Sequence, residues 1–271
     1  MLAETIGKTA LITGSSSGLG VEFAQQLAAR GYNLLLTSRR EERLQQLADL
    51  IGSRYSVQVS YQTADLSKLT DIDRLVSTIK NLTHLELLVN NAGFGTVGRF
   101  SRVDADKELA MLNVHMVAPV MLCRAALPGM ISRNHGAIIN VASIAGLIPI
   151  RNVLYYSTKA FLISFTEALH AELHDSQVRV QALCPGFVLT EFHDTIEYSR
   201  FQRTSVPRFL WMSPEKVVSE SLKTLQKRNV ICIPGNIYRF AGVLSRNSIS
   251  AGIIKIAAQL VLRRRKTFIN S

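Results

Sequence analysis

The sequence predicts an α/β fold, with a doubly wound parallel sheet of about seven strands and helices on both faces. Short, almost continuously apolar segments alternate with longer segments of helical spacing, which is typical of parallel strands buried beneath helices. The 271 residues are 47% hydrophobic and 19% charged, so the chain can bury a large core. No repeat or low-complexity linker divides it. We therefore expect one domain over residues 1–235 and a tail over residues 236–271.

The individual elements are expected in strict alternation. Buried strands are indicated by apolar, β-branched runs at residues 8–13, 33–38, 57–62, 85–90, 137–142, 178–184 and 230–233. Helices are indicated by apolar residues recurring every three or four positions, at 18–30, 41–51, 69–82, 105–132, 154–173 and 214–227. The long helix 105–132 is expected to bend at Pro119, because proline lacks the N–H group of the helical ladder. Ligands of such sheets bind beyond the carboxyl ends of the strands.

Charge and cysteine content exclude several classes of protein. The net charge is +11, but residues 221–271 alone contain ten Lys and Arg residues and no Asp or Glu. The rest is almost neutral, so no nucleic-acid partner is expected. Cys123, Cys184 and Cys232 lie in apolar runs without metal-ligand spacing, which indicates free thiols in a reducing compartment and no metal site. No signal peptide or bilayer-spanning run is recognised, and a cytoplasmic location is expected.

Tyr155 and Lys159 begin the helix expected at 154–173, twelve residues after Ser143. Four residues are about one helical turn, so both side chains leave the same helix face. Lowering the pKa of a phenol from about 10 to about 7 requires roughly 4 kcal/mol. A positive charge at about 4 Å supplies about that much at an effective dielectric near 20. The pair alone is common on helices, but in this context it predicts a tyrosine that donates a proton near neutral pH.

A glycine-rich turn, residues 13–20 (TGSSSGLG), follows the first expected strand. Glycines let the backbone approach a pyrophosphate, and the following helix offers free N–H groups and a positive dipole end. The TGxxxGxG spacing between a strand and a helix is a stronger signal than a glycine-rich turn alone.

With these motifs the chain resembles the short-chain dehydrogenase/reductase family over nearly all of residues 8–235. The matching positions occur in the expected order: Gly14–Gly20, Asp65, Asn90–Gly93, Asn113, Ser143, Tyr155 with Lys159, and Pro185–Thr190. The resemblance implies a Rossmann fold, a nicotinamide cofactor and hydride transfer between that cofactor and a carbonyl carbon. A homo-oligomer is also expected.

The resemblance implies a role for each matching position. Ser143 would bind the substrate oxygen, Tyr155 would transfer the proton, Lys159 would bind the nicotinamide ribose, and Asn113 would hold a water linking Lys159 to solvent. The implied cofactor-binding residues are Gly14, Ser16, Ser17, Gly18, Leu19, Gly20, Asp65, Leu66, Asn91, Ala92, Gly93, Tyr155, Lys159, Pro185, Gly186, Val188 and Thr190. Asp65 and Leu66 are expected at the adenine and Pro185–Thr190 at the carboxamide. Alternatively, Asp65 only caps the next helix.

One spacing departs from the family pattern. The serine usually precedes the tyrosine by thirteen positions, whereas Ser143 precedes Tyr155 by twelve. Tyr156 would restore thirteen, but it lies only three residues before Lys159. We select Tyr155, because the loop 147–153 can lose a residue, whereas the tyrosine must stay four residues before Lys159 to share its helix face.

The end of the second strand predicts the cofactor. Thr37–Arg40 contains no acid that could bind an adenosine 2′-hydroxyl, and a guanidinium matches a phosphate through paired hydrogen bonds. We expect NADP(H) in preference to NAD(H), with Arg39 as the main contact. The alternative is that Arg39 and Arg40 face solvent.

The segment 187–212 is expected to form a lid over the substrate. Its large apolar side chains are Phe192, Ile196, Tyr198, Phe201, Phe209, Leu210 and Trp211, interleaved with Arg200, Arg203 and Arg208. This composition suits a lipophilic ketone or alcohol, such as a 3-oxoacyl thioester, although the same side chains could close the core or bind a partner subunit. The predicted function is therefore NADPH-dependent reduction of a ketone, or oxidation of the matching alcohol.

The tail contains an apolar stretch at 248–262 and a basic cluster at 263–266. About 15 helical residues are too short to span a bilayer, but they suit peripheral contact with an anionic membrane through residues 248–266. A helix docked on protein is the alternative. Two alternative functions follow, namely a catalytically silent NADP-binding sensor or scaffold, and a membrane-binding module acting through the tail.

Overall fold

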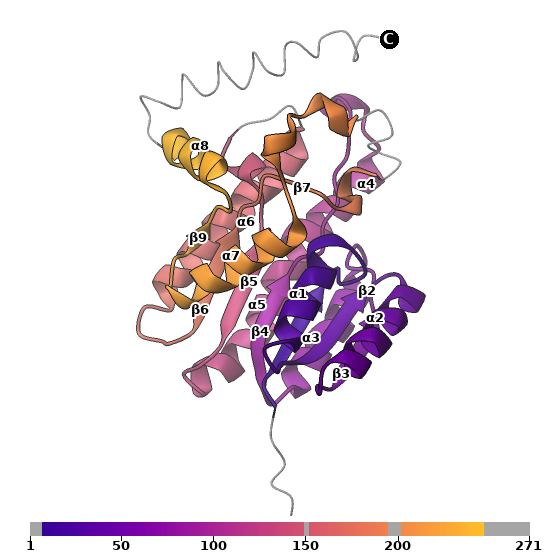
Figure 1. Cartoon of the computed structure of the whole chain (residues 1–271), viewed down its shortest axis with the longest axis vertical. Coiled ribbons are helices and arrows are strands. Elements are labelled where there is room, and N and C mark those ends of the chain that lie inside the picture. The colour runs from indigo at the N-terminus through magenta and orange to yellow at the C-terminus, as the bar shows by residue number, and fades with distance from the viewer. Residues whose placement is uncertain (1–6, 149–151, 195–201, 247–271) are drawn as a thin grey trace, which may run out of the picture.

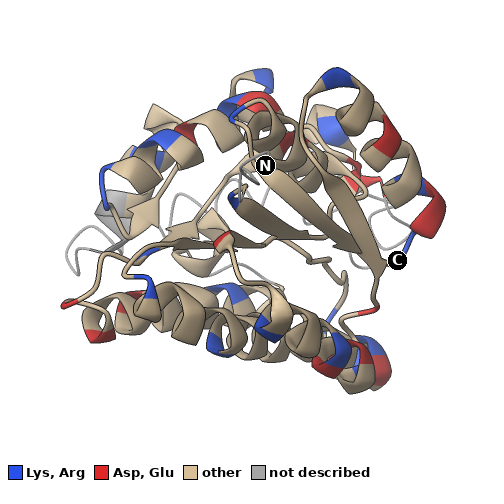
Figure 2. Cartoon of the chain, turned by 90° about the horizontal axis from the view of Figure 1, so that it is seen from below, with Lys and Arg blue, Asp and Glu red and all other residues tan. Residues whose placement is uncertain are grey.

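The computed structural model describes residues 7–148, 152–194 and 202–246. Its main sheet has seven parallel strands in the order β3-β2-β1-β4-β5-β6-β9, between two layers of helices (Figures 1 and 2). The strands are β1 (Thr9–Thr13), β2 (Asn33–Ser38), β3 (Val59–Thr63), β4 (Leu85–Asn90), β5 (Ala137–Val141), β6 (Arg179–Leu183) and β9 (Ile231–Cys232). The predicted doubly wound sheet is confirmed. The direction in which strands are added reverses between β1 and β4, where a crevice for a ligand is expected.

The two larger apolar clusters of the described residues join the sheet to its helices. One cluster packs α1 (Gly18–Ala28), α2 (Glu41–Arg54) and α7 (Pro214–Gln226) on one face. The other packs α3 (Leu69–Asn81), α5 (Ala118–Ser132) and α6 (Val153–Glu172) on the opposite face. Successive strand residues alternate between the clusters, so Leu11 belongs to the second and Ile12 to the first. Lys, Arg, Asp and Glu are interspersed over both helical layers (Figure 2).

The long helix expected at 105–132 is interrupted, but not at Pro119. It consists of α4 (Ala105–Leu112), a π-helical turn η2 (Asn113–Val117) and α5. The backbone N–H of Ala118 donates to the carbonyl of Asn113, one residue farther back than in an α-helix. Pro119 supplies no N–H group, so the ladder adjusts upstream of it, and the irregular turn contains the candidate residue Asn113. The combined helix, Ala105–Ser132, is long and apolar enough to cross a membrane, but here it packs on the sheet as a core helix.

Two further features follow β6. Strands β7 (Phe187–Val188) and β8 (Trp211–Met212) pair in parallel at the two ends of the expected lid. Helix α8 (Asn236–Arg246) begins inside the segment expected as a tail, and its Tyr238 is buried in the first apolar cluster. Short 3₁₀ turns are η1 (Phe100–Arg102), η3 (Ile144–Gly146), η4 (Glu191–His193), η6 (Arg203–Ser205) and η7 (Arg208–Leu210). The expected membrane segment 248–266 and the lid residues Ile196, Tyr198, Arg200 and Phe201 lie outside the described residues.

Candidate active site

The glycine-rich loop between β1 and α1 forms a narrow backbone cradle. Gly14 and Gly18 adopt φ angles of 66° and 55°, which favour glycine. A Cβ on Gly20 would lie 2.2 Å from the carbonyl oxygen of Gly14, so no side chain fits there. Ser17 precedes α1 without a side-chain cap, which leaves the first N–H groups of the helix available to a ligand. Narrow backbone and uncapped donors together fit a diphosphate group.

The ends of β1 and β4 are fastened to each other below this cradle. The Thr13 hydroxyl accepts hydrogen bonds from the backbone N–H groups of Asn91 (2.9 Å) and Ala92 (3.0 Å). The Asn91 amide donates to the carbonyls of Thr13 (2.9 Å) and Gly14 (3.1 Å). The Asn91 side chain therefore holds the loop in shape, while the backbone at Gly93 stays exposed beside the crevice. Thr13 was included in the TGxxxGxG motif, but this role of its hydroxyl was not foreseen from the sequence, because a threonine in a β-strand is common.

The segment after β3 is organised by Asp65. One oxygen of this carboxylate accepts from the backbone N–H (3.1 Å) and the hydroxyl (2.8 Å) of Ser67, so Asp65 shapes the turn before α3. This structural role resembles the helix-capping alternative considered for Asp65. Leu66 is buried in the second apolar cluster. The Asn113 amide donates to the Ser67 carbonyl at 2.8 Å, which ties the π-helical turn to this segment.

The basic end of β2 carries Arg39 and Arg40. Arg39, predicted as the main phosphate contact, is exposed, and that role stays a prediction. Arg40 instead turns back toward the glycine loop and donates through Nε to the Ser16 hydroxyl at 3.0 Å. The Ser38 hydroxyl accepts from the Arg40 backbone N–H at 3.1 Å, and this contact shapes the turn. Arg43, one helical turn along α2, points to the same place, as a spacing of three from Arg40 could have indicated.

Ser143 and Tyr155 come together at the carboxyl end of β5. The Ser143 side chain contacts the Tyr155 phenol and accepts from the Ala145 backbone N–H at 3.1 Å. The next residue, Ile144, donates to the carbonyl of Pro185 at 3.0 Å, which brings the Pro185–Thr190 segment to the same site. Among the two candidate tyrosines the structure places Tyr155, not Tyr156, beside Ser143.

Lys159 does not lower the pKa of Tyr155 in this structure, contrary to expectation. Its ammonium donates to the Val141 carbonyl at 2.8 Å and lies 5.7 Å from the centre of the Tyr155 ring. Burial lowers the pKa of Lys159 to about 8. Burial also raises the pKa of Tyr155 to about 12, and the contact with Ser143 opposes that rise only in part. The physical reason is desolvation, which disfavours the charged form of both groups.

His115 is a site residue that sequence reasoning missed. It lies in the π-helical turn, is 1% exposed and packs edge-on against Tyr155 with ring centroids 5.8 Å apart. The Phe94 backbone N–H donates to Nε2 at 3.2 Å, so the ring proton must sit on Nδ1, 3.0 Å from the Thr158 hydroxyl. Burial, followed by the Lys159 charge, lowers the pKa of His115 well below its usual value. A neutral imidazole thus connects the loop after β4 to α6.

The start of α6 is fixed by Asn152, which the sequence analysis did not single out. The Asn152 side chain caps the helix by accepting from the Tyr155 backbone N–H at 3.2 Å, and its amide donates to the Thr96 carbonyl. Asparagine just before a helix is a recognisable capping signal. The cap orients the first turn of α6, which carries Tyr155.

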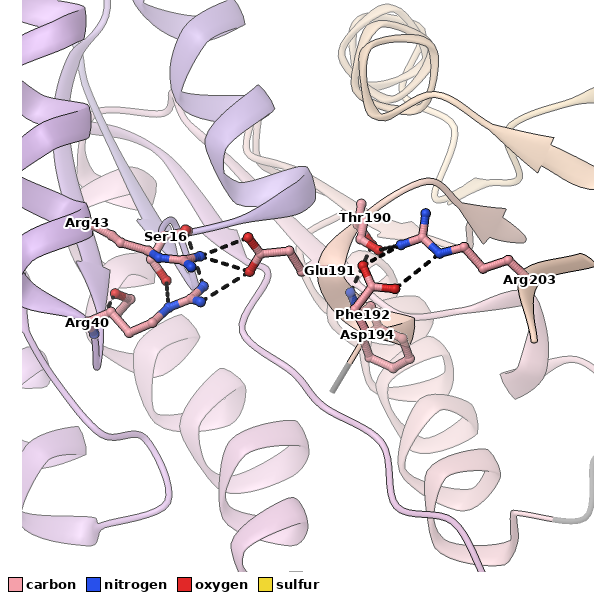
Figure 3. Close-up of polar contacts among 9 residues, drawn as sticks. Ser16, Arg40, Arg43, Thr190, Glu191, Phe192, Asp194 and Arg203 are labelled. Atoms are coloured by element: carbon pink, nitrogen blue, oxygen red, sulfur yellow. Dashed lines mark hydrogen bonds and ion pairs between the residues drawn. The ribbon is translucent and has the colours of Figure 1, made fainter. Parts of the chain in front are cut away.

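The lid supplies an aromatic wall beside Tyr155. The Phe192 ring lies 6.0 Å from the Tyr155 ring, and the Phe187 and His193 rings each lie 5.3 Å from Trp211. Leu210 packs against the core, whereas Phe209 is 71% exposed. Arg203 is paired with Asp194 at 2.6 Å and donates to the Thr190 carbonyl at 2.7 Å (Figure 3).

A cavity of about 460 Å³ opens between the glycine loop and the lid. Its lining residues are Ser16, Ser17, Gly18, Val21, Glu22, Leu189, Thr190, Glu191, Arg203 and Pro214. Four of the sequence-predicted cofactor-binding residues, Ser16, Ser17, Gly18 and Thr190, thus face one space. No cluster of His, Cys, Asp and Glu suited to a metal ion is found among the described residues. The glycine loop forms a site suited to a dinucleotide, and the site of Ser143 and Tyr155, suited to proton transfer, adjoins it.

Comparisons with known proteins agree with this geometry. Residues 8–200 match the family model described as short chain dehydrogenase. A very-long-chain 3-oxoacyl-CoA reductase of Anas platyrhynchos is 33% identical over 241 residues, which cover 86% of this chain and 74% of the relative. A short-chain dehydrogenase from Sphingobium yanoikuyae in complex with NADPH has a TM-score of 0.79 at 27% identity and covers 94% of this chain and 95% of its own. A family member from Burkholderia phymatum in complex with NAD has a TM-score of 0.76 at 25% identity, covering 88% and 92%.

Proposed function

This chain belongs to the short-chain dehydrogenase family of oxidoreductases, and we propose that it uses NADP(H) to reduce a ketone on a lipophilic, 3-oxoacyl-type substrate. The observation that carries the proposal is the meeting of the Ser143 and Tyr155 hydroxyls beside the buried Lys159. These groups lie at the carboxyl ends of the strands, next to the glycine cradle.

The chain's own residues would hold the cofactor and move the proton. The backbone of Gly14–Gly20 would bind the diphosphate, Arg40 and Arg43 the 2′-phosphate, and Lys159 the nicotinamide ribose. When bound, the nicotinamide supplies the hydride. The Tyr155 hydroxyl donates its proton to the carbonyl oxygen, and the Ser143 hydroxyl hydrogen-bonds the same oxygen. A phenol with a raised pKa remains protonated near neutral pH, so Tyr155 starts this step as the acid.

The choice of substrate is supported by two observations. Phe192 lies beside Tyr155, and Trp211 lies next to His193 in the same turn; these rings suit a hydrocarbon chain better than a polar ketone. The Anas platyrhynchos relative is named for reduction of very-long-chain 3-oxoacyl-CoA.

Purified protein tests the proposal through the absorbance of NADPH. We expect oxidation of NADPH with long-chain 3-oxoacyl thioesters, slower oxidation with short-chain ones, and a lower kcat/KM with NADH. Tyr155→Phe should bind NADPH as the wild type does and lose at least about 100-fold in kcat, since a positioned general acid contributes about that much. Near-normal turnover by this variant would remove Tyr155 from the mechanism, and equal rates across chain lengths would exclude the lipophilic substrate.

A further inference from the structure

Glu191 connects the two sides of the proposed cofactor cleft. It follows Thr190 on the lid side, and Figure 3 shows Arg40 and Arg43 converging on it from the side of β2. Arg40 Nη1 lies 3.1 Å from one carboxylate oxygen, and Arg43 Nη1 lies 2.9 Å from both. Arg40 also donates to the hydroxyl (3.0 Å) and the carbonyl (3.2 Å) of Ser16. Two guanidinium groups therefore hold one carboxylate beside the glycine loop.

This donor set suits a phosphate as well as a carboxylate. Guanidinium groups pair with both anions through parallel hydrogen bonds, and the Ser16 hydroxyl can serve as an additional donor. Burial would raise the pKa of Glu191, but the hydrogen bonds from Arg40 and Arg43 outweigh it and keep that pKa below its usual value. Glu191 is consequently an anion at neutral pH and occupies the position where we place the 2′-phosphate of NADP(H).

The same short turn reaches the proton-transfer site. The Thr190 hydroxyl accepts from the Phe192 backbone N–H at 3.3 Å, which fixes η4. Within that turn Phe192 lies against Tyr155, and His193 lies against Trp211. A movement of Glu191 away from the arginines would therefore move a ring that now covers Tyr155.

We propose that Glu191 is a specificity-determining residue that competes with the 2′-phosphate of NADP(H) for Arg40 and Arg43. The inference rests on the proposed use of NADP(H). A phosphate monoester carries up to about two negative charges and three acceptor oxygens, so it displaces the carboxylate, whereas a ribose hydroxyl does not. Displacement releases η4, and Phe192 withdraws from Tyr155. Occupation of the phosphate site thereby opens the substrate side of the cleft.

The side chains of Glu191, Arg40 and Arg43 are 52%, 42% and 46% exposed, so the contact is weak enough to exchange. An exposed pair of this kind changes an equilibrium by up to about five-fold. Glu191 makes two such pairs, so removing its charge should change the affinity of the protein for a 2′-phosphate by about three- to ten-fold.

Titration calorimetry with adenosine fragments tests the competition without any nicotinamide. The ligands are 2′,5′-ADP, which carries the 2′-phosphate, and 5′-AMP, which does not. We expect Glu191→Gln to bind 2′,5′-ADP about three- to ten-fold more tightly than the wild type, and 5′-AMP within about two-fold. The matched control is Asp194→Asn, which removes a neighbouring charge that pairs with Arg203 and should leave the affinity for 2′,5′-ADP within about two-fold of the wild type.

Trp211 reports the movement of the turn, because it is the only tryptophan of the chain. In the wild type 2′,5′-ADP should change its emission and 5′-AMP should not. In Glu191→Gln the ligand-free protein should already show the emission of the bound wild type. Equal affinity of wild type and Glu191→Gln for 2′,5′-ADP overturns the competition and leaves NADP(H) use intact. Equal affinity of the wild type for the two fragments overturns NADP(H) use itself.

Discussion

Lys159 is a buried ammonium, and burying its charge costs folding free energy. Lowering the pKa of a lysine from 10.5 to about 8 corresponds to about 3 kcal/mol at neutral pH, because folding must desolvate the charge. Among the described residues, its hydrogen-bond acceptor is the Val141 carbonyl. The apolar clusters on both faces of the sheet must offset this penalty, so part of the stability of the fold is used to keep a cation beside Tyr155.

His115 predicts a specific pH dependence of stability. The unfolded chain protonates this imidazole below about pH 6.5, whereas the folded protein keeps it neutral. The unfolded state therefore binds more protons in that range, and the free energy of unfolding falls as the pH drops, by up to about 1.4 kcal/mol per pH unit for this residue. We expect His115→Gln to reduce that slope by about this amount in urea unfolding between about pH 5 and about pH 8.

The matched control for this experiment is His170→Gln, since His170 is exposed on α6. Its slope should equal that of the wild type. A slope of His115→Gln equal to that of the wild type would show that the buried imidazole titrates in the folded protein as it does in the unfolded chain.

At the scale of elements, α8 fastens the base of the lid through one side chain. The Tyr238 hydroxyl accepts from the Phe187 backbone N–H (3.1 Å) and donates to the Leu210 carbonyl (2.6 Å), one contact at each end of the lid. A Cβ on Gly186 would lie 2.0 Å from the Tyr238 ring, so the ring lies directly on the segment that follows β6. The strands β7 and β8 are only two residues each, so the contacts of Tyr238 on α8 contribute to holding the two ends of the lid together.

Tyr238→Phe should therefore loosen the lid and lower stability. Without the hydroxyl, the Phe187 N–H and the Leu210 carbonyl lose a partner in a partly buried region, which costs about 1–3 kcal/mol. Urea unfolding measures this loss, and steady-state kinetics should show a lower kcat. Tyr61→Phe is the matched control, because Tyr61 on β3 is 36% exposed, and it should change stability by less than about 0.5 kcal/mol. A loss no larger than that of the control would contradict the role of Tyr238.

At the scale of the whole molecule, apolar periodicity predicted the sheet and six of its covering helices, because burial on both faces dictates those patterns. The glycine loop and Ser143 were also predictable, since each follows a strand that the periodicity defines. Tyr155 and Lys159 were predictable from their spacing of about one turn at the start of an expected helix. Glu191 and His115 were not, and Arg43 was missed although its spacing of three from Arg40 could have indicated it. Their roles depend on which side chains meet across the cleft, and Glu191 meets Arg43 across 148 positions of sequence. The homo-oligomer, the cytoplasmic location and the membrane contact of residues 248–266 stay predictions.

The proposed preference for NADP(H) also predicts a change in the stability of the whole molecule. A ligand that binds only the folded state at about 100 times its Kd adds about 2.7 kcal/mol to the free energy of unfolding. For a chain of this size that corresponds to a rise in Tm of about 5–10 °C. NADH at the same concentration should give a smaller rise, because Arg40 and Arg43 then meet no phosphate. The measurement is a thermal scan followed by Trp211 fluorescence, with Tyr155→Phe as a control that should keep the full rise with NADPH. Equal rises with the two cofactors would show that these arginines do not select between them.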